Sequence, residues 1–138
     1  MKVNCILLVD DDESDNYFHE YTIKKADICH NLKIATDGAK ALEYIHRAGQ
    51  SGQTEEYPLP DIIFLDINMP RMNGFEFLEE YKLLDQRLRS GIVITMLTTS
   101  LNPSDREKAL QTGIVSEFLN KPLTPEMLEE ILKKYFTK

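Results

Sequence analysis

The sequence has little of what builds disulfide frameworks, zinc sites, nucleic-acid surfaces or membrane spans. It holds two cysteines, Cys5 and Cys29, in 138 residues. Their separation matches no metal-ligand spacing, so we interpret them as structural or incidental thiols and not as a disulfide. Acidic residues (23) outnumber basic ones (16), and the net charge of -7 argues against a nucleic-acid partner. No apolar run approaches the roughly 20 residues of a membrane span, and the N-terminus is strand-like and unlike a signal peptide. We therefore expect a cytoplasmic protein that binds neither nucleic acid nor membrane.

Short apolar segments alternate regularly with helix-forming segments. The expected strands are rich in Ile, Leu and Val, which suits strands covered on both faces, and are Cys5–Val9, Leu32–Ala35, Ile62–Asp66, Ile92–Leu97 and Val115–Leu119. The expected helices are Ser14–Ala26, Ala39–Ala48, Gly74–Leu88, Ser104–Thr112 and Pro125–Phe136. Such alternation predicts an α/β fold, a parallel sheet with helices on both faces. The length predicts one domain over residues 1–138, without an output domain.

Local signals mark some of the boundaries. Asn102 or Ser104 can cap the fourth helix, and Thr124 can cap the fifth, ahead of Pro125. The segment Gly49–Pro60, "GQSGQTEEYPLP", is polar with two prolines and two glycines, and it predicts an exposed connection.

Polar side chains follow four of the five expected strands. Ligands of such sheets bind beyond the carboxyl ends of the strands, so we expect these side chains to share one edge. They are Asp10, Asp11 and Asp12 after the first strand, Asp66 at the end of the third, Thr98, Thr99 and Ser100 after the fourth, and Asn120, Lys121 and Pro122 after the fifth. Adjacent carboxylates behind an apolar strand repel one another. They therefore either cap the next helix or bind a cation.

The residue types at this edge favour phosphoryl chemistry. Carboxylates together with a backbone carbonyl suit a hard cation such as Mg²⁺. A lysine can pair with an oxyanion, and a hydroxyl can donate a hydrogen bond to it. An aspartate beside a divalent cation is a competent nucleophile toward phosphorus.

Four motifs in order carry a family resemblance. "VDD" after the first strand, "FLDINMP" around Asp66, "LTTS" after the fourth strand and "NKP" after the fifth resemble the receiver domain of two-component response regulators, of the chemotaxis-regulator type. The resemblance covers essentially the entire chain. It implies a flavodoxin-like (βα)5 fold, with a doubly wound five-stranded parallel sheet in the order 2-1-3-4-5.

The resemblance also implies an acceptor and a metal site. Asp66 would accept the phosphoryl group from the phosphohistidine of a sensor histidine kinase. Asp11 and Asp66 would ligate Mg²⁺, for which Mn²⁺ can substitute, with the backbone carbonyl of Asn68 as a third ligand. Asp10 would act largely through water.

The remaining motif residues would respond to phosphorylation. Lys121 would pair with Asp66 and then with the phosphoryl oxygens, while Thr98 would move to hydrogen-bond the phosphate. Phe118 would turn inward with Thr98. Pro122 stands where the family has its Lys-Pro peptide, often cis.

Hydrolysis of the phosphorylated form would depend on two neighbouring positions. Asn68 and Ser100, each two residues beyond a motif residue, would orient water, and we expect intermediate self-dephosphorylation. Thr99 replaces the small residue common in the family and could restrict access to the phosphate.

Plainer interpretations stay open beside these roles. Asp12 reads as a capping or surface residue, and Phe118 can be a core residue. We interpret His19, His30 and His46 as surface residues.

The leading hypothesis for function is a switch that catalyses only its own phosphorylation and dephosphorylation. Phosphate on Asp66 would bias a protein–protein surface on the last helix, the fifth strand and the helix before it, in a monomer or a phosphorylation-dependent dimer. The downstream protein is unknown. Alternatives are a phosphorelay intermediate that serves a histidine phosphotransferase, a docking module, and a Mg²⁺-dependent phosphatase, against which Asn68 counts because such enzymes commonly carry an acid there.

Overall fold

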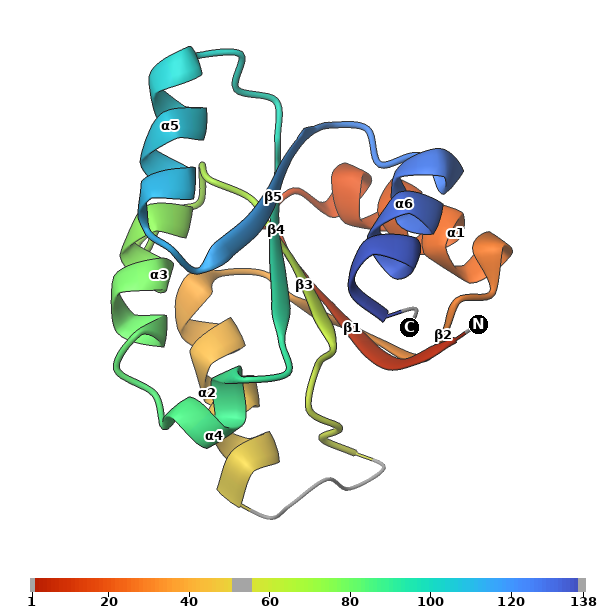
Figure 1. Ribbon diagram of the computed structural model, residues 1–138, viewed down its shortest axis with the longest axis horizontal. Coiled ribbons are helices and arrows are strands. Elements are labelled where there is room, and N and C mark those ends of the chain that lie inside the picture. Colours follow the sequence, from red (N-terminus) through yellow and green to blue (C-terminus); the bar gives the residue numbers. More distant parts are fainter. Residues whose placement is uncertain (1, 51–55, 137–138) are drawn as a thin grey trace.

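Five parallel strands form the centre of the molecule in the order β2-β1-β3-β4-β5, which confirms the expected sheet (Figure 1). The computed structural model describes residues 2–50 and 56–136. The strands are β1 (Val3–Val9), β2 (Cys29–Ala35), β3 (Ile62–Leu65), β4 (Val93–Thr98) and β5 (Val115–Asn120). All four residues of β3 are buried, as are six of the seven in β1. This double burial explains why these strands read as continuous apolar runs.

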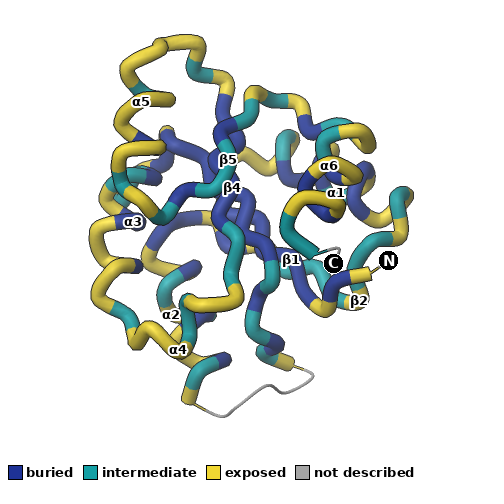
Figure 2. The backbone as a smooth tube through the Cα atoms, viewed as in Figure 1, coloured by how far each residue is buried: buried dark blue, intermediate teal, exposed yellow. Residues whose placement is uncertain are grey.

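Helices cover both faces of the sheet, and the central strands β1, β3 and β4 are the most buried part of the chain (Figure 2). On one face lie α1 (Glu13–Ala26) and α6 (Pro125–Phe136), and on the other α2 (Gly38–Gln50), α3 (Gly74–Tyr81), α4 (Gln86–Arg89) and α5 (Pro103–Gln111). Two apolar clusters result. One contains Ile23 of α1 and Leu128 of α6, and the other contains Ile45 of α2 and Phe77 of α3.

The expected helix over Gly74–Leu88 is wrong, because the chain forms two helices there. After Tyr81 the backbone tightens into a turn in which the Leu84 N–H donates to the Tyr81 carbonyl (3.1 Å). Asp85 then adopts a non-helical backbone, and its carboxylate accepts from the Arg87 N–H. Asp85 is thus the N-cap of the short helix α4, and a cap begins a new helix.

The expected exposed connection over Gly49–Pro60 is partly wrong. Helix α2 continues through Gly49 to Gln50. Pro58 and Pro60 are buried, and the Tyr44 hydroxyl donates to the Pro58 carbonyl (2.5 Å). This contact ties the end of the connection to α2. Positions 51–55 lie outside the described residues.

Two expectations drawn from composition agree with the described residues. Cys5 and Cys29 are free thiols, the first buried and the second partly buried. Within residues 2–50 and 56–136, no helix has the length and apolar character needed to cross a membrane.

Candidate functional site at the carboxyl edge of the sheet

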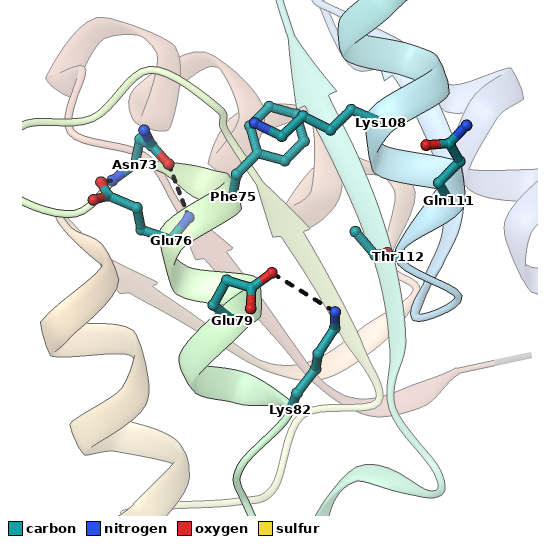
Figure 3. Close-up of a pocket in the computed structure, with 8 residues that line it drawn as sticks. All are labelled: Asn73, Phe75, Glu76, Glu79, Lys82, Lys108, Gln111 and Thr112. Carbon is teal, nitrogen blue, oxygen red and sulfur yellow. Dashed lines mark hydrogen bonds and ion pairs between the residues drawn. The ribbon is translucent and has the colours of Figure 1, made fainter.

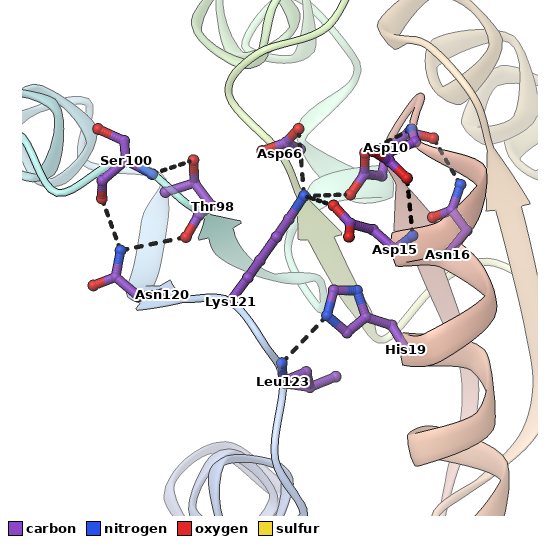
Figure 4. Close-up of polar contacts among 11 residues, drawn as sticks. Asp10, Asp15, Asn16, His19, Asp66, Thr98, Ser100, Asn120, Lys121 and Leu123 are labelled. Carbon is purple, nitrogen blue, oxygen red and sulfur yellow. Dashed lines mark hydrogen bonds and ion pairs between the residues drawn. The ribbon is translucent and has the colours of Figure 1, made fainter.

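The predicted residues converge at the carboxyl ends of the strands (Figure 4). The N–H of Asp10 donates to the Ala35 carbonyl (3.1 Å) and that of Asp66 to the Val9 carbonyl (3.0 Å). These bonds extend the strand ladders by one residue, so both backbones are fixed by the sheet. Asp10 and Asp66 are buried, whereas Asp11 is exposed.

Three carboxylates form a cluster that fits a divalent cation. One carboxylate oxygen each from Asp10, Asp11 and Asp66 lies within 4.8 Å of the others. An all-oxygen donor set of this charge matches the preference of Mg²⁺ and Mn²⁺. Asn68 lies exposed on the loop two residues after Asp66, and its part as a carbonyl ligand stays a prediction.

Lys121 lies closer to two other acids than to its expected partner. Its Nζ is 2.7 Å from a carboxylate oxygen of Asp10 and 2.7 Å from one of Asp15, but 3.6 Å from Asp66. Sequence reasoning missed Asp15 because it reads as an ordinary acid in a first helical turn. The signal that could have found it is position: α1 begins directly after β1, so its first turn faces the same edge.

Burial and neighbouring charges together shift the pKa values of Asp66 and Lys121. It raises the pKa of Asp66 to about 6, helped by the charges of Asp10 and Asp11 and opposed by Lys121. For Lys121, burial lowers the pKa, but the hydrogen bonds to Asp10 and Asp15 and the charge of Asp66 outweigh it and raise the pKa above the usual lysine value. The lysine is therefore a permanent cation beside a carboxylate that is costly to ionise.

Thr98 is completely buried at the end of β4, and a set of hydrogen bonds holds the chain that follows it. The Thr98 hydroxyl accepts from the Ser100 N–H (3.2 Å), and the Ser100 hydroxyl donates to Asp105 of α5 (2.6 Å). The side-chain amide of Asn120 donates to the carbonyls of Thr98 (3.3 Å) and Ser100 (2.7 Å). Thr99 is exposed. Because the Ser100 hydroxyl is engaged with Asp105, its effect on hydrolysis stays a prediction.

Phe118 already lies inside the protein. It is buried, and the Arg106 guanidinium lies 6.0 Å from its ring centroid and donates to its carbonyl (3.3 Å). This position suits both a core residue and a switch residue. Three residues further along the chain, the Lys121–Pro122 peptide is cis, the geometry that the resemblance implies.

The expectation of three surface histidines is wrong for His19. His30 and His46 are exposed, but His19 is buried, and its Nε2 accepts from the Leu123 N–H (3.3 Å). Burial and the nearby charge of Lys121 lower its pKa, so the ring is held neutral. His19 thereby links α1 to the segment that carries Lys121.

Asp12 serves as a cap, as its plainer interpretation proposes. Its carboxylate accepts from the Asp15 N–H (3.0 Å) at the start of α1. The adjacent Asn16 was not predicted, and its amide donates to the Asp10 carbonyl (2.8 Å). Asn16 therefore holds the backbone of Asp10, whereas the Asp12 side chain acts at the start of α1.

A separate hollow lies between α3 and α5, away from the acidic cluster (Figure 3). Its lining includes Phe75, with the Lys108 ammonium 4.3 Å from the ring centroid, and the ion pair of Glu79 with Lys82 (3.7 Å). These contacts already pair the charges, and no residue of the acidic cluster lines the hollow.

A buried aspartate that follows a parallel strand, with further acids and a lysine around it, is an arrangement that suits cation-assisted phosphoryl chemistry. The response regulator receiver domain model matches residues 6–133. The chain therefore belongs to the response regulator receiver family, as the four motifs imply.

Individual relatives agree with this assignment. Response regulator Rcp1 of Synechocystis is 37% identical over 100 residues, which span 72% of this chain and 65% of Rcp1. Hybrid signal transduction histidine kinase C of Dictyostelium discoideum is 31% identical over 122 residues, which span 75% of this chain and 10% of that protein. The crystal structure of a two component response regulator from Cytophaga hutchinsonii superposes with a TM-score of 0.89 at 28% identity, covering 100% of both chains. The matched region spans less than two thirds of the length of Rcp1 and of the hybrid kinase.

Proposed function

We propose that this protein accepts a phosphoryl group on Asp66 from the phosphohistidine of a sensor histidine kinase or histidine phosphotransferase, in the cytoplasm, and thereby switches a protein–protein surface. One observation carries the proposal: the Asp66 carboxylate shares a cluster with Asp10 and Asp11 and lies 3.6 Å from the Lys121 ammonium. On one side of Asp66 the acids can hold a cation, and on the other side Lys121 can pair with the oxygens of an incoming phosphoryl group.

The transfer is a displacement at phosphorus. A carboxylate oxygen of Asp66 forms a bond to phosphorus while the phosphorus–nitrogen bond of the donor breaks, and the imidazole nitrogen keeps the electron pair and takes up a proton. Mg²⁺ held by Asp10, Asp11 and Asp66 would neutralise charge on the transferring group. Lys121 supplies a second positive charge toward the phosphoryl oxygens.

Hydrogen bonds of the unphosphorylated protein support a connection between Thr98 and the proposed surface. Movement of Thr98 toward a phosphoryl oxygen would take its hydroxyl away from the Ser100 N–H and loosen the chain between β4 and α5. Helix α5 is linked to β5 through Arg106 and the Phe118 carbonyl. Helix α6 is linked to β5 through Lys134 and Glu117 (2.7 Å). A change at Thr98 would therefore reach α5, β5 and α6 together.

The direct test is the intact mass of the protein after incubation with acetyl phosphate and Mg²⁺. We expect one added phosphoryl group in the wild type and none in Asp66→Asn or in excess chelator. Asp12→Asn is the matched control, because asparagine also caps helices and the variant removes one nearby carboxylate without touching the acceptor. A phosphoryl group on Asp66→Asn, or none on folded wild type with either acetyl phosphate or a phosphorylated histidine kinase, contradicts the proposal.

A further inference from the structure

Lys121 lies between three carboxylates that come from three different elements. Asp10 follows β1, Asp66 follows β3, and Asp15 lies in the first turn of α1. The lysine side chain is 8% exposed, so little solvent compensates its charge, whereas the Asp15 side chain is 37% exposed. Asp15 is therefore the more exposed partner of the lysine, and Asp10 and Asp66 are its inner, buried partners; Figure 4 shows the lysine in contact with all three.

The two inner partners, Asp10 and Asp66, can bind a divalent cation as well as Lys121. Asp10 and Asp66 belong to the carboxylate cluster that fits a divalent cation, and a carboxylate that approaches a divalent cation is less available to an ammonium group. Like charges also repel at these distances. Binding of the cation thus weakens the hold of the inner acids on Lys121.

Asp15 is not part of the candidate cation site, and its backbone position is fixed. It does not belong to the carboxylate cluster. Its backbone N–H donates to the Asp12 carboxylate (3.0 Å) at the start of a fourteen-residue helix. The 2.7 Å contact of its carboxylate with Lys121 can therefore persist when the inner acids turn to a cation.

We propose that Asp15 is a positioning residue for Lys121, which keeps the ammonium group in place when a divalent cation takes the Asp10 carboxylate. Without Asp15, the cation and the lysine compete for the same carboxylate, and the cation binds more weakly. This inference deepens the proposed function, because it concerns the same lysine and the same cation site.

The test is the affinity for Mg²⁺, measured by isothermal titration calorimetry without any phosphodonor. We expect Asp15→Asn to weaken Mg²⁺ binding about five-fold, the effect of one partly exposed ion pair. Asp12→Asn removes a charge from the same helical turn without contacting Lys121, and we expect it to change the affinity less than about two-fold. Asp15→Glu keeps the charge and should restore most of the affinity.

A double-mutant cycle separates a role through Lys121 from a general charge effect. In a Lys121→Met background, Asp15→Asn should weaken Mg²⁺ binding no more than Asp12→Asn does. Equal shifts for Asp15→Asn and Asp12→Asn, or a full Asp15→Asn shift in the Lys121→Met background, overturn the proposal, as does wild type that binds no Mg²⁺. The measurement is independent of phosphorylation at Asp66, so it fails separately from the proposed function. Circular dichroism spectra of each variant establish that it is folded.

Discussion

At the scale of single residues, the Asp66 carboxylate costs the folded protein stability in the absence of a cation. Its pKa is raised from the ordinary 3.8 to about 6, mainly by burial. Between these values the folded protein binds the proton more tightly than the unfolded chain, so Asp66 makes the free energy of unfolding fall as pH rises through this window. In a chelator at about pH 7.5, Asp66→Asn should therefore raise the free energy of unfolding by about 2 kcal/mol, measured by urea denaturation.

A pH series provides the control for this prediction. The gain from Asp66→Asn should shrink toward zero at about pH 3, below both pKa values, where the carboxyl group is mostly protonated in the folded and the unfolded state. His19 acts in the opposite direction, because its lowered pKa makes stability fall as pH drops below about 6.5. The difference between variant and wild type cancels the His19 contribution. A variant less stable than wild type at neutral pH would show that ionised Asp66 is well compensated by Lys121.

The site residues that could be predicted from the sequence are those that stand at or directly after the carboxyl end of a strand. Parallel strands have their carboxyl ends at one edge of the sheet, and this brings together Asp10, Asp66, Thr98 and Lys121. The partners that sequence missed depend on which way a helix faces. The position of Asp15 directly after β1 places it near this edge, but which residue of the first turn reaches Lys121 depends on the phase of α1.

At the scale of elements, the junction between β3 and α3 leaves no room for a side chain at Gly74. A Cβ atom there would lie 2.5 Å from the Asp66 carbonyl oxygen and 3.0 Å from the Ile67 Cα. Both are backbone atoms, so Gly74→Ala must displace α3 or the Asp66 backbone. We expect a loss of about 2 kcal/mol in the free energy of unfolding and slower phosphorylation of Asp66 by acetyl phosphate.

Gly91 is the matched control for Gly74, because a Cβ atom there meets nothing within 4 Å. Gly91→Ala should leave both the urea midpoint and the phosphorylation rate close to wild type. If Gly74→Ala behaves like Gly91→Ala, the junction is looser than the contact distances indicate.

The hydrophobic pattern of the sequence predicts most of the helices and strands, and it fails where a specific contact interrupts an element. Apolar periodicity continues from Gly74 to Leu88, so one helix is the natural expectation. The cap at Asp85 interrupts it, since a carboxylate that bonds the backbone of its own turn competes with helix continuation. Likewise, the Tyr44 hydroxyl bonds the carbonyl of Pro58, fourteen residues away in the sequence, and no local pattern reveals this contact.

At the scale of the whole molecule, α1 presents the chain's main group of exposed aromatic side chains among the residues described. Tyr17, Phe18 and Tyr21 are 75%, 48% and 58% exposed. Because α1 begins beside Asp10 and Asp11, and exposed apolar patches commonly mark protein interfaces, we expect a protein that brings a phosphohistidine to Asp66 to contact these rings.

The final prediction compares a small phosphodonor with a protein donor in the variant that carries Tyr17→Ala and Tyr21→Ala. Acetyl phosphate does not use the α1 surface, so it should phosphorylate the variant at the wild-type rate. Transfer from a phosphorylated histidine kinase core should slow about ten-fold or more, because two aromatic anchors of the interface are gone. Leu83→Ala is the control: this leucine is 80% exposed but lies beyond the end of α3 that is remote from Asp66, so both rates should stay unchanged. Equal slowing with the two donors would mean that the tyrosines support the phosphorylation site itself, whereas slowing confined to the kinase would assign α1 to the docking surface.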